Sequence, residues 1–366
     1  MAAIYFDILH LYYLPQFLPV ARKLRAAKCD LLFVVHNEPQ TASVTHKALN
    51  DEGFSFQVVE NADQAKALYL DKKPNWVIFG NAPCSSYTEL QSEGLKLAYM
   101  QHGIGPKACY YVTSEFPFDV RFVEGPKRLQ RLSEMFPNRR FEDVGYAKLD
   151  PLFCEGDSEL VSLANAVDLA SLGLDPKKST ILYAPTFFPS SIECFSDDWP
   201  SEMSAYNIII KPHFFSYTKK KYHKQRDKLD AWATHSNVYM GPIDCYSLLP
   251  FMGLADIMLS EASSTVFEFA ALDKPVVWCD FYKVRWTYRG IFKSRLTKRM
   301  DPDMSIFHDI CERATDPKQV AQLVAQSLAS PSIKSAQRKA VTLDMAGKTD
   351  GKCSSRIRDY LLVNLG

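Results

Sequence analysis

Small hydroxyl side chains follow a short apolar run in the second half of the chain. Residues 255–259 are mostly apolar, as in a buried parallel strand, and the stretch after them contains Ser263, Ser264 and Thr265 before an apolar segment with helical spacing. Hydroxyls beside the free N–H groups of a helix start can bind phosphate oxygens. Glu268, one turn further, could reach the hydroxyls of a sugar. The same pattern also fits an ordinary capped helix of the core.

Two histidines also follow predicted strands. His102 comes after the strand predicted at 95–100 and precedes a glycine-rich turn that ends in Lys107. Histidine is suited to general base catalysis near neutral pH, and Lys107 could neutralise a phosphate. Lys211 and His213 end the strand predicted at 207–213, where an imidazole could bind a donor's phosphate or assist its departure. Each histidine equally fits a turn or strand edge without a catalytic role.

Three polar residues near the end of the chain form a weaker pattern. Asp350 and Gly351 predict a turn into a helix, and Arg356 lies one turn into that helix. The basic stretch 219–224 is typical of a solvated helix face, and the stretch 283–299, which is both basic and aromatic, could form a flexible loop on the acceptor side. Whether they contact an acceptor or a membrane stays open.

Predicted strands and helices alternate along the chain, which indicates an α/β fold with parallel sheets. The predicted strands are 3–8, 31–35, 54–59, 76–80, 95–100, 121–123, 141–144, 180–185, 207–213, 238–240, 255–259 and 276–279. The predicted helices are 14–27, 62–70, 154–178, 219–230, 247–253, 316–328 and 354–363. We expect two doubly wound, Rossmann-like domains, 1–150 on the acceptor side and 151–366 on the nucleotide-donor side, facing a cleft. The last helix could pack back on the first domain.

Composition narrows the class of protein. The 366 residues include 47% hydrophobic and 23% charged residues, as in a folded globular protein, and the net charge of +1 argues against a nucleic-acid binder. The nine cysteines and eight histidines show no metal-ligand spacing, and no P-loop is present, so we expect neither a metal nor another cofactor. Without a secretory signal or a transmembrane run, a cytoplasmic location is expected, with peripheral contact at the inner face of the membrane left open.

Taken in order, the stretches above resemble the CDP-glycerol glycerophosphotransferase family, the teichoic-acid primases and polymerases with a GT-B-like fold. The residues that carry the resemblance are 102–107, 183–186, 211–213, 261–268, 274–275 and 350–356. The resemblance implies a metal-independent transferase with a nucleotide-activated donor, CDP-glycerol first. The acceptor would be a hydroxyl of a cell-surface polysaccharide, a teichoic-acid-like polymer or a lipid-linked precursor.

The resemblance also implies roles for individual residues. His102 would be the base that activates the acceptor hydroxyl, while His213 and the hydroxyls of 263–265 would hold the donor's phosphates. The residues implied to lie near the nucleotide, the glycerol or the diphosphate are Glu268, Asp350, Gly351 and Arg356.

The chain departs from the family pattern at several positions. Glu261 and Ala262 replace the usual Asp-Tyr before the serine pair, and Gly105 stands where Pro or Leu is common. These differences leave three alternatives open. They are a glycosyltransferase that uses a UDP-, GDP- or CMP-sugar, an enzyme like UDP-N-acetylglucosamine 2-epimerase, and a non-catalytic binding module of a capsule-assembly complex.

Overall fold

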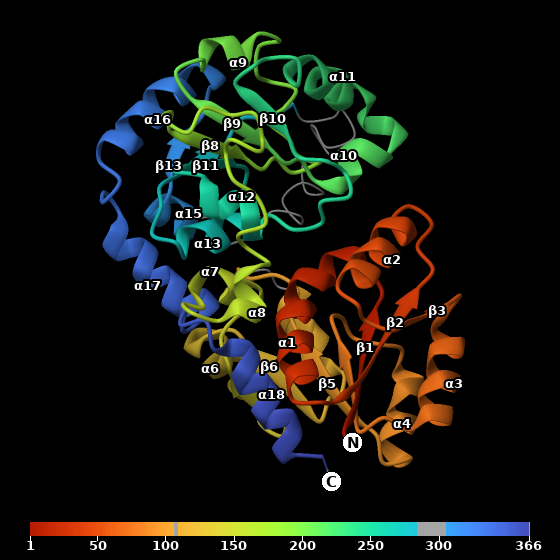
Figure 1. Cartoon of the computed structure of the whole chain (residues 1–366). Helices are drawn as coiled ribbons and strands as arrows, with labels where there is room; N and C mark the ends of the chain where they lie inside the picture. Colours follow the sequence, from red (N-terminus) through yellow and green to blue (C-terminus); the bar gives the residue numbers. More distant parts are fainter. Residues whose placement is uncertain (106–108, 284–304, 366) are drawn as a thin grey trace, which may run out of the picture. The chain divides into compact units, whose positions relative to one another are not determined.

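The computed structural model describes residues 1–105, 109–283 and 305–365, and these residues form two compact units (Figure 1). Unit 1 comprises Met1–Ser162 and Leu343–Gly366, and unit 2 comprises Leu163–Thr342. The sequence placed the division at residue 150. In the structure the first unit extends to Ser162, and it also includes the C-terminal segment from Leu343 onward with the last helix.

Unit 1 is built on a seven-stranded sheet in the order β3-β2-β1-β4-β5-β6-β7, with all neighbouring strands parallel. The strands are β1 (Ala3–Ile8), β2 (Asp30–His36), β3 (Phe56–Val59), β4 (Trp76–Phe79), β5 (Lys96–Met100), β6 (Val120–Val123) and β7 (Phe141–Asp143). Each had been predicted from the sequence, although β7 has no apolar run. The strand order reverses between β1 and β4, and ligands of such sheets bind at the carboxyl ends of the strands beside this reversal.

The helices of unit 1 lie on both faces of the sheet (Figure 1). They are α1 (Leu14–Ala26), α2 (Ala42–Asp51), α3 (Ala62–Lys72), α4 (Thr88–Ser92), α5 (Cys109–Val112), α6 (Pro126–Met135), α7 (Asp150–Phe153), α8 (Ser158–Val161) and α18 (Cys353–Val363). The start of α3 is fixed by Asn61, whose side chain accepts a hydrogen bond from the N–H of Gln64 at 3.0 Å. Two elements distant in sequence, α1 and α18, pack side by side (Figure 1).

A buried carboxylate attaches α18 to unit 1. Asp150 accepts hydrogen bonds from the backbone N–H groups of Cys353, at 3.1 Å, and Ser354, at 2.6 Å. These are the free N–H groups of the first turn of α18, so the bonds also cap the helix. The preceding turn requires a glycine at Gly351, where φ is +67° and a Cβ would lie 2.6 Å from the carbonyl oxygen of Phe153.

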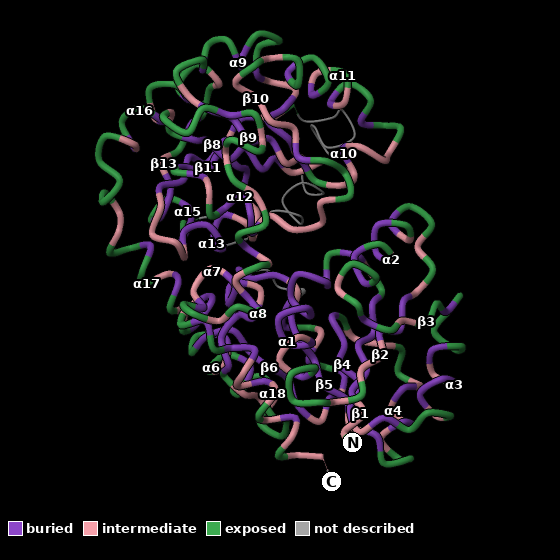
Figure 2. The backbone as a smooth tube through the Cα atoms, viewed as in Figure 1, coloured by how far each residue is buried: buried purple, intermediate pink, exposed green. Residues whose placement is uncertain are grey.

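Unit 2 contains a six-stranded parallel sheet in the order β10-β9-β8-β11-β12-β13. The strands are β8 (Thr180–Tyr183), β9 (Asn207–Ile210), β10 (Val238–Met240), β11 (Ile257–Ser260), β12 (Val276–Cys279) and β13 (Glu312–Ala314). Here the order reverses between β8 and β11. Every residue of β8, β9, β11 and β12 is buried, which explains why their sequences are mostly apolar (Figure 2).

The helices of unit 2 surround a core that is rich in aromatic side chains, among them Tyr183, Trp199 and Trp232. They are α9 (Trp199–Glu202), α10 (Phe214–Thr218), α11 (His223–Trp232), α12 (Leu249–Leu254), α13 (Ser264–Ala270), α15 (Ser305–Ile310) and α16 (Val320–Ala329), and α17 (Ser335–Ala346) continues into unit 1. Among the described residues, no helix is long and apolar enough to cross a membrane.

The helix predicted over 154–178 is wrong, because only α8 is helical within that range. Two local features break it. The side chain of Asp168 accepts a hydrogen bond from the N–H of Ser171 at 2.7 Å and so favours a turn. Gly173 then adopts φ of +73°, which no helix residue has. Conversely, the sequence did not predict β13 or α17.

Candidate active site

His102 lies two residues after β5, and its ring is fixed by the strand beside it. Its Nδ1 is 3.0 Å from the carbonyl oxygen of Gly80, which directly follows β4. A carbonyl only accepts hydrogen bonds, so Nδ1 must carry the proton. In the neutral ring Nε2 then holds the lone pair, which is the form that a general base needs. The structure therefore holds His102 in a tautomer suited to the role predicted for it.

Close packing sets the position of this ring. Tyr13 lies with its ring centroid 5.1 Å from that of His102, and Tyr146 donates its hydroxyl to the backbone carbonyl of His102 at 2.9 Å. Gly80 must be a glycine, because a Cβ there would lie 2.6 Å from the ring of Tyr13. Tyr13 can therefore lie against the sheet end beside His102.

A buried ion pair contacts the turn that follows the histidine. Arg128 donates to the carbonyl oxygen of Gly105 at 2.7 Å, and Gly105 adopts φ of +122°. The Nε of Arg128 lies 2.8 Å from Oε1 of Glu124, and the two side chains are only 3% and 2% exposed. Lys107, the predicted phosphate ligand of this turn, lies outside the described residues.

Sequence reasoning missed two polar groups at the ends of β1 and β2. Asp7 accepts hydrogen bonds from Nε2 of His36 at 3.0 Å and from the hydroxyl of Tyr69 at 2.6 Å. His10, just after β1, has its Nδ1 3.3 Å from Oε1 of Glu38. Both histidines stand at the carboxyl end of a strand, as His102 does, so the signal that identified His102 was present for them too.

The Asp7–His36 pair predicts a pH-dependent stability. Burial lowers the pKa of His36, but the hydrogen bond to Asp7 and the charge of Asp7 outweigh burial, so the pKa is raised. The folded state then binds this proton more tightly than the unfolded chain. The stabilisation is fully present below the ordinary histidine pKa of about 6.5 and is lost as pH rises through the folded value.

We therefore expect the free energy of unfolding, measured by urea denaturation at a series of pH values, to fall as pH rises from the ordinary histidine pKa through the raised pKa of His36. The fall should be steeper for the wild type than for His36→Gln. Equal pH dependence in the two proteins would contradict the assignment of the proton to this pair.

In unit 2, Glu261 joins the two strand ends beside the reversal. One carboxylate oxygen accepts from the N–H of Thr186 at 2.6 Å, and the other accepts from the N–H of Ser191 at 2.6 Å and from its hydroxyl at 2.7 Å. Burial raises the pKa of Glu261, although all three hydrogen bonds act to lower it. Glu261 thus ties the loop after β8 to the turn after β11, a positioning role for a residue that the sequence noted only as a departure from the family pattern.

The predicted hydroxyl cluster begins directly after this carboxylate. Ser263, Ser264 and Thr265 are all partly exposed, and the hydroxyls of Ser263 and Thr265 lie 2.5 Å apart. Ser263 is the N-cap residue of α13, but its side chain makes no capping bond. Its hydroxyl is thus not used to cap the helix. Glu268 is only 1% exposed, so its carboxylate is not presented to a sugar in this arrangement.

His213 is exposed at the start of α10, and its Nδ1 accepts a hydrogen bond from the N–H of Phe215 at 3.1 Å. In the neutral ring the proton therefore sits on Nε2, so the tautomer is opposite to that of His102 and suits a hydrogen-bond donor. Lys211 differs from expectation, because its ammonium donates to the carbonyl oxygen of Pro242 at 3.1 Å and its aliphatic stem packs where a Cβ on Gly241 would lie.

The residues predicted near the end of the chain have a packing role in unit 1. Arg356 donates to the carbonyl oxygen of Val144 at 3.1 Å and forms an ion pair with Asp350. Together with Gly351 they fix the turn that leads into α18. These contacts explain the three residue types by packing alone, with no bound nucleotide. The proposed part of these residues in nucleotide and phosphate binding stays a prediction. Of the basic stretch 283–299, all but Lys283 lies outside the described residues.

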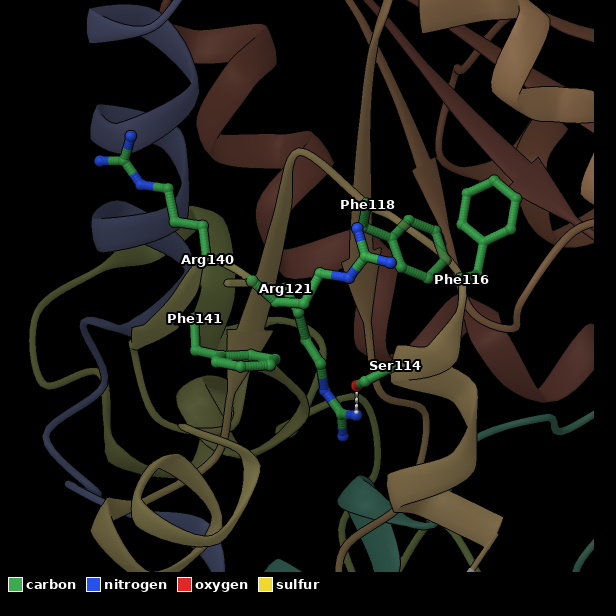
Figure 3. Close-up of a pocket in the computed structure, with 7 residues that line it drawn as sticks. Ser114, Phe116, Phe118, Arg121, Arg140 and Phe141 are labelled. Carbon is green, nitrogen blue, oxygen red and sulfur yellow. Dashed lines mark hydrogen bonds between the residues drawn. The ribbon is translucent and has the colours of Figure 1, made fainter. Parts of the chain in front are cut away.

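Two cavities are lined by none of the candidate site residues described above. One, of about 10 Å³, lies beside β6, where Arg121 donates to Ser114 (Figure 3). It is far smaller than the roughly 300 Å³ or more of ligand pockets. The other measures about 430 Å³ and is lined in part by Val276, the first residue of β12. It therefore lies at the amino ends of the strands, whereas Glu261 lies at their carboxyl ends. In the part of the chain that the structure describes, no group of three or more His, Cys, Asp or Glu side chains is arranged to hold a metal ion.

Comparison of this chain with known proteins identifies a matching protein family. The family model described as CDP-Glycerol:Poly(glycerophosphate) glycerophosphotransferase matches residues 111–363. A teichoic acid ribitol-phosphate primase from Bacillus spizizenii is 26% identical over 275 residues, which are 70% of this chain and 63% of the primase. The chain thus spans less than two thirds of that relative.

Solved structures confirm the α/β fold class predicted from the sequence. The wall teichoic acid polymerase TagF, of GT-B type, superposes with a TM-score of 0.66 at 15% identity, over 100% of this chain and 88% of the polymerase. A structure of S. aureus MnaA with UDP gives a TM-score of 0.64 at 13% identity, over 100% of this chain and 98% of that protein. His102 precedes the residues that the family model matches, so its assignment depends on the geometry around it.

Proposed function

Because the chain belongs to the CDP-Glycerol:Poly(glycerophosphate) glycerophosphotransferase family, we propose that it transfers glycerol phosphate from CDP-glycerol to an acceptor hydroxyl. The acceptor in this proposal is a cell-surface polymer of the teichoic-acid type or its lipid-linked precursor. The match over more than half of the chain supports the reaction class. The observation that carries the catalytic part is the tautomer of His102, since the Gly80 carbonyl keeps the proton on Nδ1.

In the proposed reaction, His102 is the base. Nε2 of His102 takes the proton of the acceptor hydroxyl as the oxygen attacks the β-phosphorus of CDP-glycerol. A new phosphorus–oxygen bond forms, and the bond from that phosphorus to the bridging oxygen breaks. CMP leaves with the bonding electron pair, and the glycerol phosphate remains on the acceptor.

Unit 2 supplies the groups that bind the donor. The Nε2–H of His213 and the hydroxyls of residues 263–265 are donors to phosphate oxygens, and such hydrogen bonds are strongest where charge builds up on the leaving phosphate. Glu261 keeps the loop after β8 in place beside the hydroxyls. For a lipid-linked acceptor, the exposed Lys220 and Lys221 are proposed to contact the anionic membrane surface peripherally.

A thermal-shift screen tests the donor. We expect CDP and CDP-glycerol to raise the melting temperature selectively, because a ligand at 100 times its Kd adds about 2.7 kcal/mol to the stability of the folded state.

The double variant Ser263→Ala, Ser264→Ala should bind CDP more weakly by roughly 1–3 kcal/mol, the cost of lost hydrogen bonds to a charged group. Its binding is measured by calorimetry.

The other outcomes of the screen decide between functions. Selective stabilisation by UDP or GDP would replace CDP-glycerol by a sugar donor and move the function to glycosyl transfer or epimerisation. If no nucleotide shifts the melting temperature, the proposal of an activated donor is wrong. CDP binding unchanged in the double serine variant would remove residues 263 and 264 from the donor site.

A further inference from the structure

An exposed tyrosine stands beside His102. Tyr12 is 47% exposed, whereas its neighbour Tyr13 is only 2% exposed. The ring of Tyr12 stacks on the imidazole of His10, with 4.9 Å between centroids and an interplanar angle of 22°. Its centroid is also 5.0 Å from that of His102, whose ring is tilted by 55°. Tyr13 packs edge-on against it at 5.1 Å. Three aromatic neighbours thus fix an aromatic ring that is still open to solvent.

A carboxylate lies close to this ring. Glu38 accepts the hydroxyl of Thr41 at 2.7 Å through Oε2, while its Oε1 is 3.3 Å from Nδ1 of His10. Burial raises the pKa of Tyr12 to about 12, and the negative charge of Glu38 adds to this shift. The side chains of Glu38 and His10 are 31% and 32% exposed, so both are partly open to solvent.

The location of this group is set by the sheet. His10 follows β1, Glu38 follows β2, and His102 follows β5 beside the end of β4. All of these strands are parallel, so their carboxyl ends share one edge, and the β1–β4 reversal lies in the middle of the group. The tyrosine, the carboxylate and the proposed base therefore belong to one surface within unit 1.

We propose that Tyr12, His10 and Glu38 form the acceptor subsite beside His102, and that this subsite binds a sugar ring. The proposal builds on the transfer reaction above and names the chemical class of its acceptor. The C–H face of a pyranose stacks on the ring of Tyr12, and its hydroxyls bond to the carboxylate of Glu38 and the imidazole of His10. One hydroxyl of the acceptor then points to Nε2 of His102.

The charge at this surface favours a sugar over a bare glycerol phosphate chain. A glycerol phosphate unit has no flat apolar face for the tyrosine ring. Its phosphate would also be repelled by the carboxylate of Glu38, which is close enough to affect the titration of Tyr12. A neutral ring with hydroxyls meets neither difficulty.

Saturation-transfer NMR on the full chain, without any nucleotide, tests the subsite. The probes are methyl glycosides of hexoses and of 2-acetamido hexoses, with glycerol 3-phosphate as the comparison. We expect at least one glycoside to receive saturation on the protons of one ring face, and glycerol 3-phosphate to receive none. Tyr12→Ala should weaken glycoside binding at least about tenfold, and Tyr12→Phe, which keeps the ring, should restore most of it.

Two controls make the result specific. Met135→Ala removes another exposed apolar side chain of unit 1, 46% exposed on α6, and should bind the glycoside as the wild type does. The urea midpoint of each variant shows that it is folded. If Tyr12→Ala keeps wild-type binding, if only glycerol 3-phosphate binds, or if no glycoside binds, the sugar subsite is wrong.

This experiment separates the subsite from the proposed function. It contains no donor, so Tyr12-dependent sugar binding would stand even if no nucleotide stabilised the protein. Conversely, selective stabilisation by CDP together with the absence of sugar binding would keep the transferase and reject only the acceptor class.

Discussion

Replacement of His102 by asparagine is expected to lower the rate of transfer by about 10²- to 10⁴-fold, the usual contribution of a general base. Asparagine can still donate a hydrogen bond to the carbonyl of Gly80, so the turn after β5 should keep its shape, but no group remains to accept the proton of the acceptor hydroxyl. Because the proposed donor ligands are in unit 2, CDP affinity should stay within a few-fold of the wild type. Transfer of labelled glycerol phosphate and CDP calorimetry measure the two effects.

The matched control is His235→Asn, which changes a histidine of unit 2 whose Nδ1 lies 3.3 Å from the hydroxyl of Ser201. It should leave the transfer rate near that of the wild type. A His102→Asn protein with a near wild-type rate would remove His102 as the base. A loss of CDP affinity as large as the loss of rate would instead indicate that His102 binds the donor.

Replacement of Glu124 by glutamine is expected to cost about 3–5 kcal/mol of unfolding free energy, the range for breaking a buried ion pair from one side. Glutamine keeps the shape of the side chain but removes the charge that faces Arg128, and both side chains are almost fully buried. The guanidinium is then an uncompensated buried charge. Urea denaturation measures the change.

Two further variants test the cause. Glu134→Gln makes the same substitution at an exposed position of α6 and should change stability by less than about 0.5 kcal/mol. Glu124→Gln combined with Arg128→Met removes both charges and should recover part of the loss, although the bond to the Gly105 carbonyl is gone. A cost below about 1 kcal/mol for Glu124→Gln alone would mean that Arg128 finds another partner or water.

The sequence by itself determined the fold class and most of the strands, and it singled out His102 and His213 as candidate site residues. Strands that are buried on both faces, such as β4, β8 and β9, consist mostly of apolar residues, so they can be recognised without any knowledge of their neighbours. His102 and His213 were found because each follows such a strand within three residues. Local turn chemistry was less visible, and the false helix over 154–178 shows that Gly173 and Asp168 outweighed the apolar residues around them.

Only the tertiary structure decided which strand ends are neighbours. It brought His102 to Gly80, set Tyr12 beside His102, and joined Glu261 to Thr186 across the β8–β11 reversal. It also showed that Asp350 and Arg356 form an ion pair in the turn that leads into α18 in unit 1. The physical reason is that apolar periodicity records whether a residue is buried and not what it is buried against. Strand order, which sets those partners, arises from contacts between residues far apart in the chain.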